Sequence, residues 1–279
     1  APLIEAGLAI QPMIFGRIEP SLFRVHGGSV SIVRRADGAV GAGLGGVDRV
    51  AASARQPERG GDDSASLFLL LQDPEASDSP LGQIRNVEVR DATVRIVDEI
   101  SGVAWLVNNA RVELTRDEFR IISILQGQIA TASGFADLNI RMQAGARLTS
   151  LLLEVDVDEL YLASVAPTQG PFSALRVLDA PLSLDLIMDA RLATGIQTAS
   201  LELDIGKGVI LSQGAEHGFA GAELSLVFDP QLGSLSLDRG RIASDVFAGE
   251  LSGRIYDLDA YSGALPMRWR YEFSAGEGF

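Results

Sequence analysis

The chain has 279 residues, a formal net charge of −14 and no cysteine. With 47% hydrophobic residues it is too apolar to stay disordered, so we expect a substantial buried core or apolar surface. The excess of 37 acidic over 23 basic residues excludes nucleic acid as an expected partner, because binding would release no counterions from a polyanion.

Neither a membrane-spanning helix nor a secretion signal is evident in the sequence. No run of eighteen or more uncharged apolar residues occurs, and the opening APLIEAGLAIQP lacks a basic start followed by a continuous apolar segment. The sequence begins in the middle of an alternating pattern and ends in SAGEGF without a clear stop signal. We therefore expect this chain to be part of a longer protein, with any membrane anchor outside it.

The first 80 residues divide into two predicted parts. Residues 1–51 are predicted to form N-terminal strands, including Ser29–Arg34, with a short turn at Pro12–Phe15. Residues 52–80 are predicted to form an exposed loop followed by a short helix over Ser64–Gln72, which ends before Pro74.

Residues 81–279 are predicted to form one continuous architecture of antiparallel strands, because short runs of alternating polarity are separated by turns rich in Gly, Asp and Asn. Shifts in the alternation at Arg90–Ala92 and Asn108–Asn109 predict β-bulges or tight turns. The residues predicted to share the apolar faces are Val87, Val89, Val94, Ile96, Leu138, Ile140, Met142, Leu153, Val155, Val157, Leu182, Leu184, Leu186, Met188, Leu192, Leu201, Leu203, Ile205, Leu224, Leu226 and Phe228.

These one-sided strands need a cover that the few predicted helices cannot supply. A second sheet, closure into a barrel, a bilayer or a bound apolar ligand would each remove the apolar face from water. The closing segment MRWRYEFSAGEGF places aromatic residues on alternate positions, as in the last strand of an outer-membrane barrel, but aromatic residues are too sparse elsewhere to form two girdles.

No catalytic or cofactor motif is convincing. Gly41–Gly46 matches a dinucleotide-binding pattern, but the alternation of strands and helices that this pattern needs is missing, so a glycine-rich strand or loop is favoured. His26 and His217 have no metal-ligand spacing. Carboxylates at Asp156–Glu159 and Asp257–Asp259 are interpreted as solvated strand faces. We predict no enzyme activity, no cofactor and no metal.

Two segments carry a resemblance to a known family. GRIEPSLFRVHGGSVSIVRRADGAVGAGLG and PLGQIRNVEVRDATVRIVDEISGVAW resemble the AsmA-like family, the group that includes AsmA, YhdP and TamB, and most closely its YhdP-like branch. The matching positions are Gly16, Arg17, Ile18, Pro20, Arg24–His26, Val30–Val33, Arg34 or Arg35, Asp37, Gly38, Ile84, Val87, Val89, Ala92, Val94, Ile96, Asp98, Gly102 and Trp105. The match covers about residues 7–46 and 64–114.

The resemblance implies a mainly β fold: a long, twisted antiparallel sheet curled into an open, taco-like groove with one or two short helices. The apolar residues given above, except Val157, would line this groove and carry phospholipid acyl chains between the inner and outer membranes of a Gram-negative cell. The chain would then be a periplasmic segment of a bridge-like lipid transfer protein, tethered to the inner membrane through an anchor outside it. Outer-membrane or envelope proteins are further possible partners.

A second hypothesis comes from a different class of protein. The same strands would also suit a structural or assembly module of the cell envelope, in which the apolar faces pack on each other and leave no lipid conduit.

Overall fold

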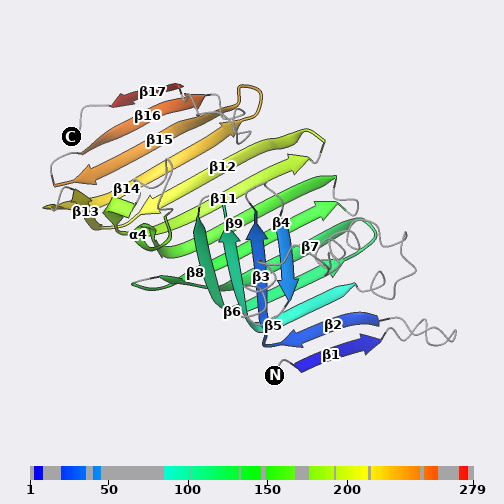
Figure 1. The fold of residues 1–279 in the computed structure, drawn as a ribbon. Coiled ribbons are helices and arrows are strands. Elements are labelled where there is room, and N and C mark those ends of the chain that lie inside the picture. The colour runs from blue at the N-terminus through cyan, green and yellow to red at the C-terminus, as the bar shows by residue number, and fades with distance from the viewer. Residues whose placement is uncertain are drawn as a thin grey trace. The chain divides into compact units, whose positions relative to one another are not determined.

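The computed structural model describes residues 3–8, 20–35, 40–44, 85–100, 102–131, 133–145, 149–166, 176–191, 193–212, 215–245, 248–256 and 270–275. Over these residues the chain is almost entirely β-strand (Figure 1). The mainly β fold predicted from the alternating pattern is confirmed.

The chain divides into two compact units, and each is described by itself. Unit 1 comprises residues 1–130, 137–148 and 167–173, and unit 2 comprises residues 131–136, 149–166 and 174–279. Unit 1 contains β1 (Leu3–Leu8), β2 (Pro20–His26), β3 (Ser29–Arg34), β4 (Val40–Leu44), β5 (Asn86–Asp98), β6 (Val103–Arg116), and most of β7 (Arg120–Thr131) and β8 (Gly134–Gly145).

Unit 2 consists of the remaining strands and one short helix. Its elements are β9 (Ser150–Tyr161), α4 (Leu162–Val165), β10 (Leu178–Asp179), β11 (Pro181–Arg191), β12 (Gly195–Ile205), β13 (Gly208–Ser212), β14 (Ala215–Asp229), β15 (Ser234–Ser244), β16 (Ala248–Tyr256) and β17 (Arg270–Ala275). The strands β11, β12, β14, β15 and β16 run side by side (Figure 1).

Several sequence predictions fall on residues that the structure does not describe. They are the loop over 52–80, the helix over Ser64–Gln72 and the turn at Pro12–Phe15. The division of the chain at residues 51 and 80 stays a prediction for the same reason. The described helix α4 spans four residues and was not expected.

The sequence predicted an antiparallel sheet. The sheet of unit 1 is instead mixed, so this part of the prediction is wrong. β2 and β3 both run parallel to β5, whereas β1 pairs with β2, β4 with β3, β6 with β5 and β7 with β6 in the antiparallel sense. Two parallel strands require a long connection, and the segment between β4 and β5 is long enough to provide it.

A line of backbone irregularities forms a crease across unit 1. Gly27–Gly28 separates β2 from β3, and the Gly27 amide donates to the Arg90 carbonyl at 2.8 Å, which places this break beside Asp91 of β5. Asp91 and Asn109 both have positive φ, at 54° and 51°, with register shifts beside them. The bulges predicted at Arg90–Ala92 and Asn108–Asn109 are thereby confirmed.

Part of the core of unit 1 lies at this crease. Figure 1 shows β3 and β4 running at a steep angle to β1 and β2, so the sheet bends sharply where the irregularities lie. The residues buried there are small or β-branched, which lets the two halves of the bent sheet approach closely. They are Val89, Ala92, Val94, Val107, Ala110 and Ile129.

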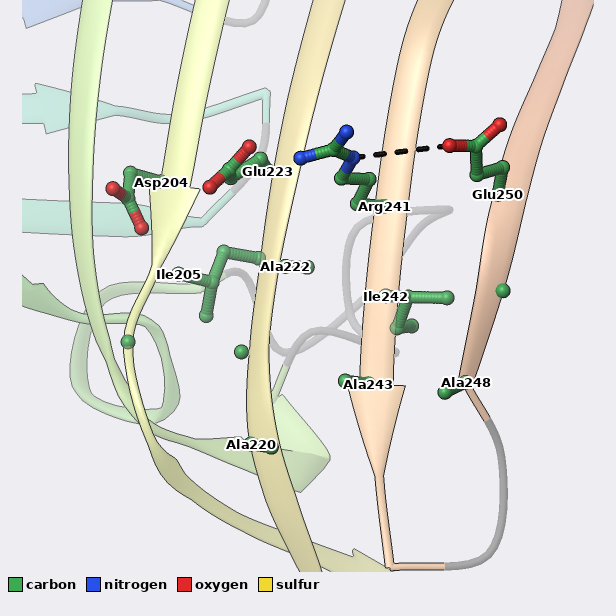
Figure 2. A pocket seen from close by; sticks show the side chains of 13 residues that line it. Asp204, Ile205, Ala220, Ala222, Glu223, Arg241, Ile242, Ala243, Ala248 and Glu250 are labelled. Carbon is green, nitrogen blue, oxygen red and sulfur yellow. Dashed lines mark ion pairs between the residues drawn. The ribbon is translucent and has the colours of Figure 1, made fainter. Parts of the chain in front are cut away.

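Unit 2 has a comparable crease. The chain breaks between β10 and β11 at Ala180, between β12 and β13 at Gly206–Lys207, and within β14 at Gly221, whose φ is 146°. These breaks are neighbours across the sheet, because Leu182 pairs with Ile205 and Ile205 pairs with Ala222. On this line lies a hollow of about 520 Å³ across β12, β14, β15 and β16 (Figure 2).

We predict that Gly208→Ala destabilises the chain by about 1–3 kcal/mol. A Cβ at this position would lie 2.2 Å from the Asp179 carbonyl oxygen and 2.5 Å from the Ala180 Cβ, so β13 would have to move away from β10. The midpoint of urea unfolding measures this loss.

Gly206→Ala is the matched control for this substitution. Its added Cβ would first meet the ring of Pro181 at 3.0 Å, a contact that small ring movements relieve. If the two variants unfold at the same urea concentration, close packing of β13 against β10 does not stabilise the crease.

Candidate functional site

The apolar residues of unit 2 lie in rows that cross the strands at right angles. In antiparallel pairing, directly opposed residues share one face of the sheet. From β9 through β11, β12 and β14 to β15, the rows are Leu153, Met188, Ala199, Phe228 and Leu235; Val155, Leu186, Leu201, Leu226 and Leu237; Val157, Leu184, Leu203, Leu224 and Gly240; and Leu160, Leu182, Ile205, Ala222 and Ile242. Each row spans roughly 19 Å at the usual strand spacing.

Burial varies along this apolar face. At the crease, Leu182, Ile205 and Ala222 are buried in a cluster with Leu162 of α4 and Phe219 of β14. Farther from the crease, the predicted residues of β11, β12 and β14 are half-buried: Leu184, Leu186, Met188, Leu201, Leu203, Leu224, Leu226 and Phe228. One end of the face is therefore a protein core, and the rest remains partly accessible.

The opposite face of unit 2 is polar. Residues that alternate with the apolar rows form a row of Asp156, Asp185, Glu202 and Ser225, and Ser225 Oγ donates to Glu202 Oε1 at 2.7 Å. Two aliphatic residues on this face, Ile187 and Val227, are 52% and 39% exposed. Neighbouring residues on one strand, such as Leu226 and Val227, thus differ in exposure because they lie on opposite faces.

Unit 1 has the same two-faced organisation. Val87 and Val89 of β5 pair with Phe23 and Val25 of β2 on one side and with Leu114 and Val112 of β6 on the other. Past the crease, Val94 pairs with Val30 and Val107, and Ile96 pairs with Ile32 and Trp105. These rows give unit 1 an apolar face of its own across β2 or β3, β5 and β6.

The remaining predicted residues occupy mixed environments. Leu138 is buried while Ile140 and Met142 are half-buried, and the three alternate along β8. In β9, Val157 is buried and Leu153 and Val155 are half-buried. Leu192 lies outside the described residues.

Sequence reasoning missed apolar residues on β7 and on the N-terminal strands. Ile121 and Ile129 of β7 are buried, and Leu125 pairs with Val112. The segment IISIL is almost continuously apolar, so it shows no clear period of two. Phe23 and Val25 join the face only through parallel pairing with β5, which local patterns do not reveal.

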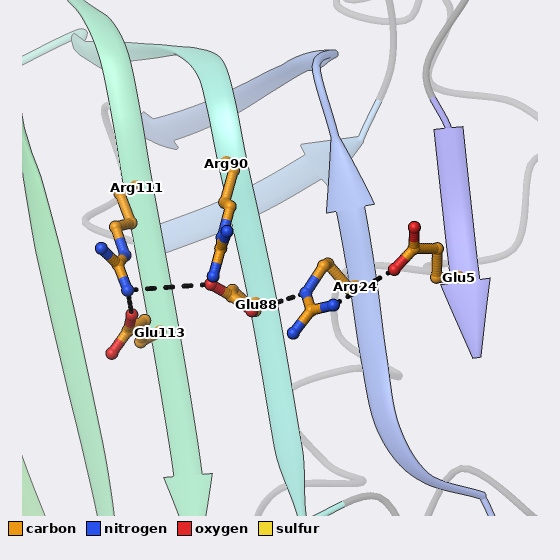
Figure 3. A network of polar contacts seen from close by, with 6 residues as sticks. All are labelled: Glu5, Arg24, Glu88, Arg90, Arg111 and Glu113. Atoms are coloured by element: carbon orange, nitrogen blue, oxygen red, sulfur yellow. Dashed lines mark hydrogen bonds and ion pairs between the residues drawn. The ribbon is translucent and has the colours of Figure 1, made fainter. Parts of the chain in front are cut away.

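The polar face of unit 1 carries an ion-pair network centred on Glu88. Figure 3 shows Arg24 of β2, Arg90 of β5 and Arg111 of β6 around this carboxylate, with Glu5 and Glu113 at the two ends. Arg24 Nε donates to Glu88 Oε2 at 2.7 Å, Arg90 Nε donates to Glu88 Oε1, and Arg111 Nη2 lies 3.8 Å from Glu88 Oε1.

This network holds Glu88 in its charged form. Hydrogen bonds from Arg24 and then Arg90 lower the pKa of Glu88, although burial of its side chain acts in the opposite direction. Because Arg24 also contacts Glu5 at 3.2 Å, the charges connect β1, β2, β5 and β6 on one face.

A pair of like charges lies on the polar face of unit 2. Asp156 and Asp185 are directly opposed on β9 and β11. A hydrogen bond between the two carboxyl groups, together with desolvation and mutual repulsion, raises the pKa of Asp156.

The described residues contain no group of three His, Cys, Asp or Glu side chains that could hold a metal ion. His217 is exposed, and His26 is a half-buried residue of β2. Residues 41–44 of the glycine-rich motif belong to strand β4, and residues 45–46 lie outside the described part. No described helix is long and apolar enough to cross a bilayer.

The fold and the site define a β-sheet protein in which each of the two units has one apolar and one charged face. No known protein family, curated protein or solved structure matches the chain.

We predict that Glu88→Gln destabilises the chain near neutral pH and that this loss shrinks as the pH falls. The folded-state pKa of Glu88 is lowered, so its contribution is fully present above the ordinary pKa of Glu and disappears as the pH falls through the folded-state value. Urea midpoints of parent and variant between about pH 6 and about pH 3 measure it.

Glu118→Gln is the control, because Glu118 is an exposed residue of the turn between β6 and β7. A loss for Glu88→Gln that stays constant over the same pH range would contradict the charge network as its cause.

For Asp156→Asn we predict the opposite sign, a gain in stability near neutral pH. The raised pKa of Asp156 means that the stability it contributes is present at low pH and lost as the pH rises through the folded-state value. The gain should therefore vanish in acid, as measured by thermal unfolding. Asp158→Asn, on the same strand and exposed, should change stability by less than about 0.5 kcal/mol.

Proposed function

We propose that this chain is a segment of a bridge-like lipid transfer protein whose apolar face binds phospholipid acyl chains. One observation carries the proposal: rows of mainly aliphatic residues, many of them only half-buried, cross β9, β11, β12, β14 and β15, while the opposite face is polar. Such a face is costly in water and requires an apolar partner.

The energetics suit a hydrocarbon ligand. Full burial of a large aliphatic side chain contributes about 1.5–3 kcal/mol, and each buried methylene of a ligand adds about 0.8 kcal/mol. A lipid lying along a row would meet side chains of similar size from successive strands. Many comparable weak contacts allow a chain to slide, whereas one deep pocket would retain it.

The resemblance to the AsmA-like family supports the same proposal. On this basis the chain acts without catalytic residues or cofactor, in the periplasm, between an inner membrane to which an anchor outside this chain tethers it and the outer membrane. Its aliphatic lining would then belong to a longer conduit for phospholipids.

The alternative function is a structural or assembly module of the cell envelope. The buried cluster of Leu162, Leu182, Ile205, Phe219 and Ala222 favours it, since this part of the apolar face already packs as an ordinary protein core. If the remaining rows are covered by polypeptide in the full-length protein, no lipid conduit exists.

Photocrosslinking at two neighbouring residues tests the proposal. A photoreactive phenylalanine derivative replacing Leu226, on the apolar face, should crosslink to phospholipid in cells. The same residue replacing Val227, on the opposite and more exposed face, should not. Mass spectrometry of the crosslinked protein identifies the adduct. Equal crosslinking at both positions, or none at Leu226, would contradict the proposal.

The variants Leu226→Asp and Val227→Asp separate the two functions. For a lipid-binding face, Leu226→Asp should keep the circular dichroism of the parent and lose copurifying phospholipid. For a dry core, it should unfold, because an unpaired charge would be buried. Val227→Asp should change neither property.

A further inference from the structure

The hollow at the crease of unit 2 has the size of a ligand site. Its volume is about 520 Å³, within the range of small-molecule pockets. Four charged residues from neighbouring strands lie in one row beside it: Asp204 of β12, Glu223 of β14, Arg241 of β15 and Glu250 of β16 (Figure 2). The lining also includes Ile205, Ala222 and Ile242, which belong to the last apolar row, so the hollow lies where charged and apolar residues meet.

The hollow exists because side chains are small where the floor would otherwise be filled. Ala243 lies two residues from Arg241, and Ala248 lies two residues from Glu250, so both alanines share the face of the charges. Gly206 and Gly221 also line the hollow, at the break after β12 and the break within β14. Gly221 has φ of 146°, a conformation that residues with side chains rarely adopt. The floor is thus apolar and shallow, and charges border one side.

The charges around the hollow favour a cation. Three carboxylates face one arginine, and the Arg241 Nε lies 3.9 Å from Glu250 Oε1, with both side chains more than half exposed. Such an exposed, long pair contributes little. Within the described residues, Asp204 and Glu223 have no ion pair of their own. A positively charged ligand would therefore gain attraction without breaking a strong contact.

The chemistry of the floor selects the kind of cation. No described group of three acidic or imidazole side chains could hold a metal ion, and the uncharged lining residues are isoleucine, alanine and glycine, which offer no side-chain oxygen ligands. We propose that the hollow binds an organic cation: an ammonium or guanidinium group that contacts Glu223 and Asp204, carried on a short apolar body that covers the floor. The group can come from a small amine or from a basic side chain of a polypeptide.

Titration with agmatine, a guanidinium and an ammonium joined by four methylenes, tests this site. In low salt, amide chemical shifts should change at the residues of the hollow. Glu223→Gln should weaken binding about tenfold through loss of a charge-assisted hydrogen bond. Arg241→Gln should strengthen binding, because it removes the competing cation. Ala243→Leu should abolish binding by filling the hollow while leaving every charge in place.

Matched controls distinguish a site from general attraction to an acidic protein. Glu216→Gln removes an exposed carboxylate of β14 outside the hollow and should leave binding unchanged. Butanol, which has the apolar body but no charge, should not bind. Weakening by Glu216→Gln equal to that by Glu223→Gln, or weakening by Arg241→Gln, would overturn the proposal.

A second arm identifies the source of the cation. An uncharged peptide with a single central arginine, compared with its citrulline analogue, reports on a polypeptide ligand. Stronger binding of the arginine peptide than of agmatine assigns the hollow to a basic protein segment, and the reverse assigns it to a small amine. If neither agmatine nor the arginine peptide shifts the residues of the hollow, the inference is wrong.

Discussion

The structure depends on the cost of exposing aliphatic side chains on one face of a sheet. Strands such as β11, β12 and β14 present Leu, Ile or Met on alternate positions, and cross-strand pairing brings these positions into rows. The backbone hydrogen bonds of a sheet lie between neighbouring strands, so they do not remove the apolar side chains from water. These side chains must pack against another part of the protein or against a ligand. The creases are a partial solution, since bending a sheet lets two parts of one face pack on each other.

Bending in turn explains the distribution of small and left-handed residues. Asp91 and Asn109 are among the residue types that tolerate positive φ best, and they lie where β5 and β6 change direction. Alanines at positions 92 and 110 are almost fully buried beside them. Larger side chains at these positions would hold the two halves of the sheet apart. The charged face of unit 1 complements this arrangement. Its ion pairs connect neighbouring strands on the face opposite the apolar residues, so they take no space in the core.

Local pattern was enough to predict most of the strands and the face to which their apolar residues belong. The alternation from Leu182 onward and the phase shifts near Asp91 and Asn109 are visible in one dimension, because they reflect the period of a strand. Strand β7 was missed since Ile121, Ile122, Ile124 and Leu125 obscure that period. The parallel pairing of β2 and β3 with β5 and the alignment of breaks into creases depend on register between distant segments. A single sequence contains no local signal for these features.

The parallel alignment of β2 with β5 also bears on how the chain acquires its fold. Arg24 and Glu88 are 64 residues apart in sequence yet adjacent in the sheet. When β2 is first synthesised, it therefore lacks its pairing partner β5. Closing so long a loop has an entropic cost, and sheets rich in such distant contacts fold slowly. During synthesis, the first strands would wait with unsatisfied edges until β5 emerges. During this interval the edges of β2 and β3 that later pair with β5 stay exposed, although these strands are made first.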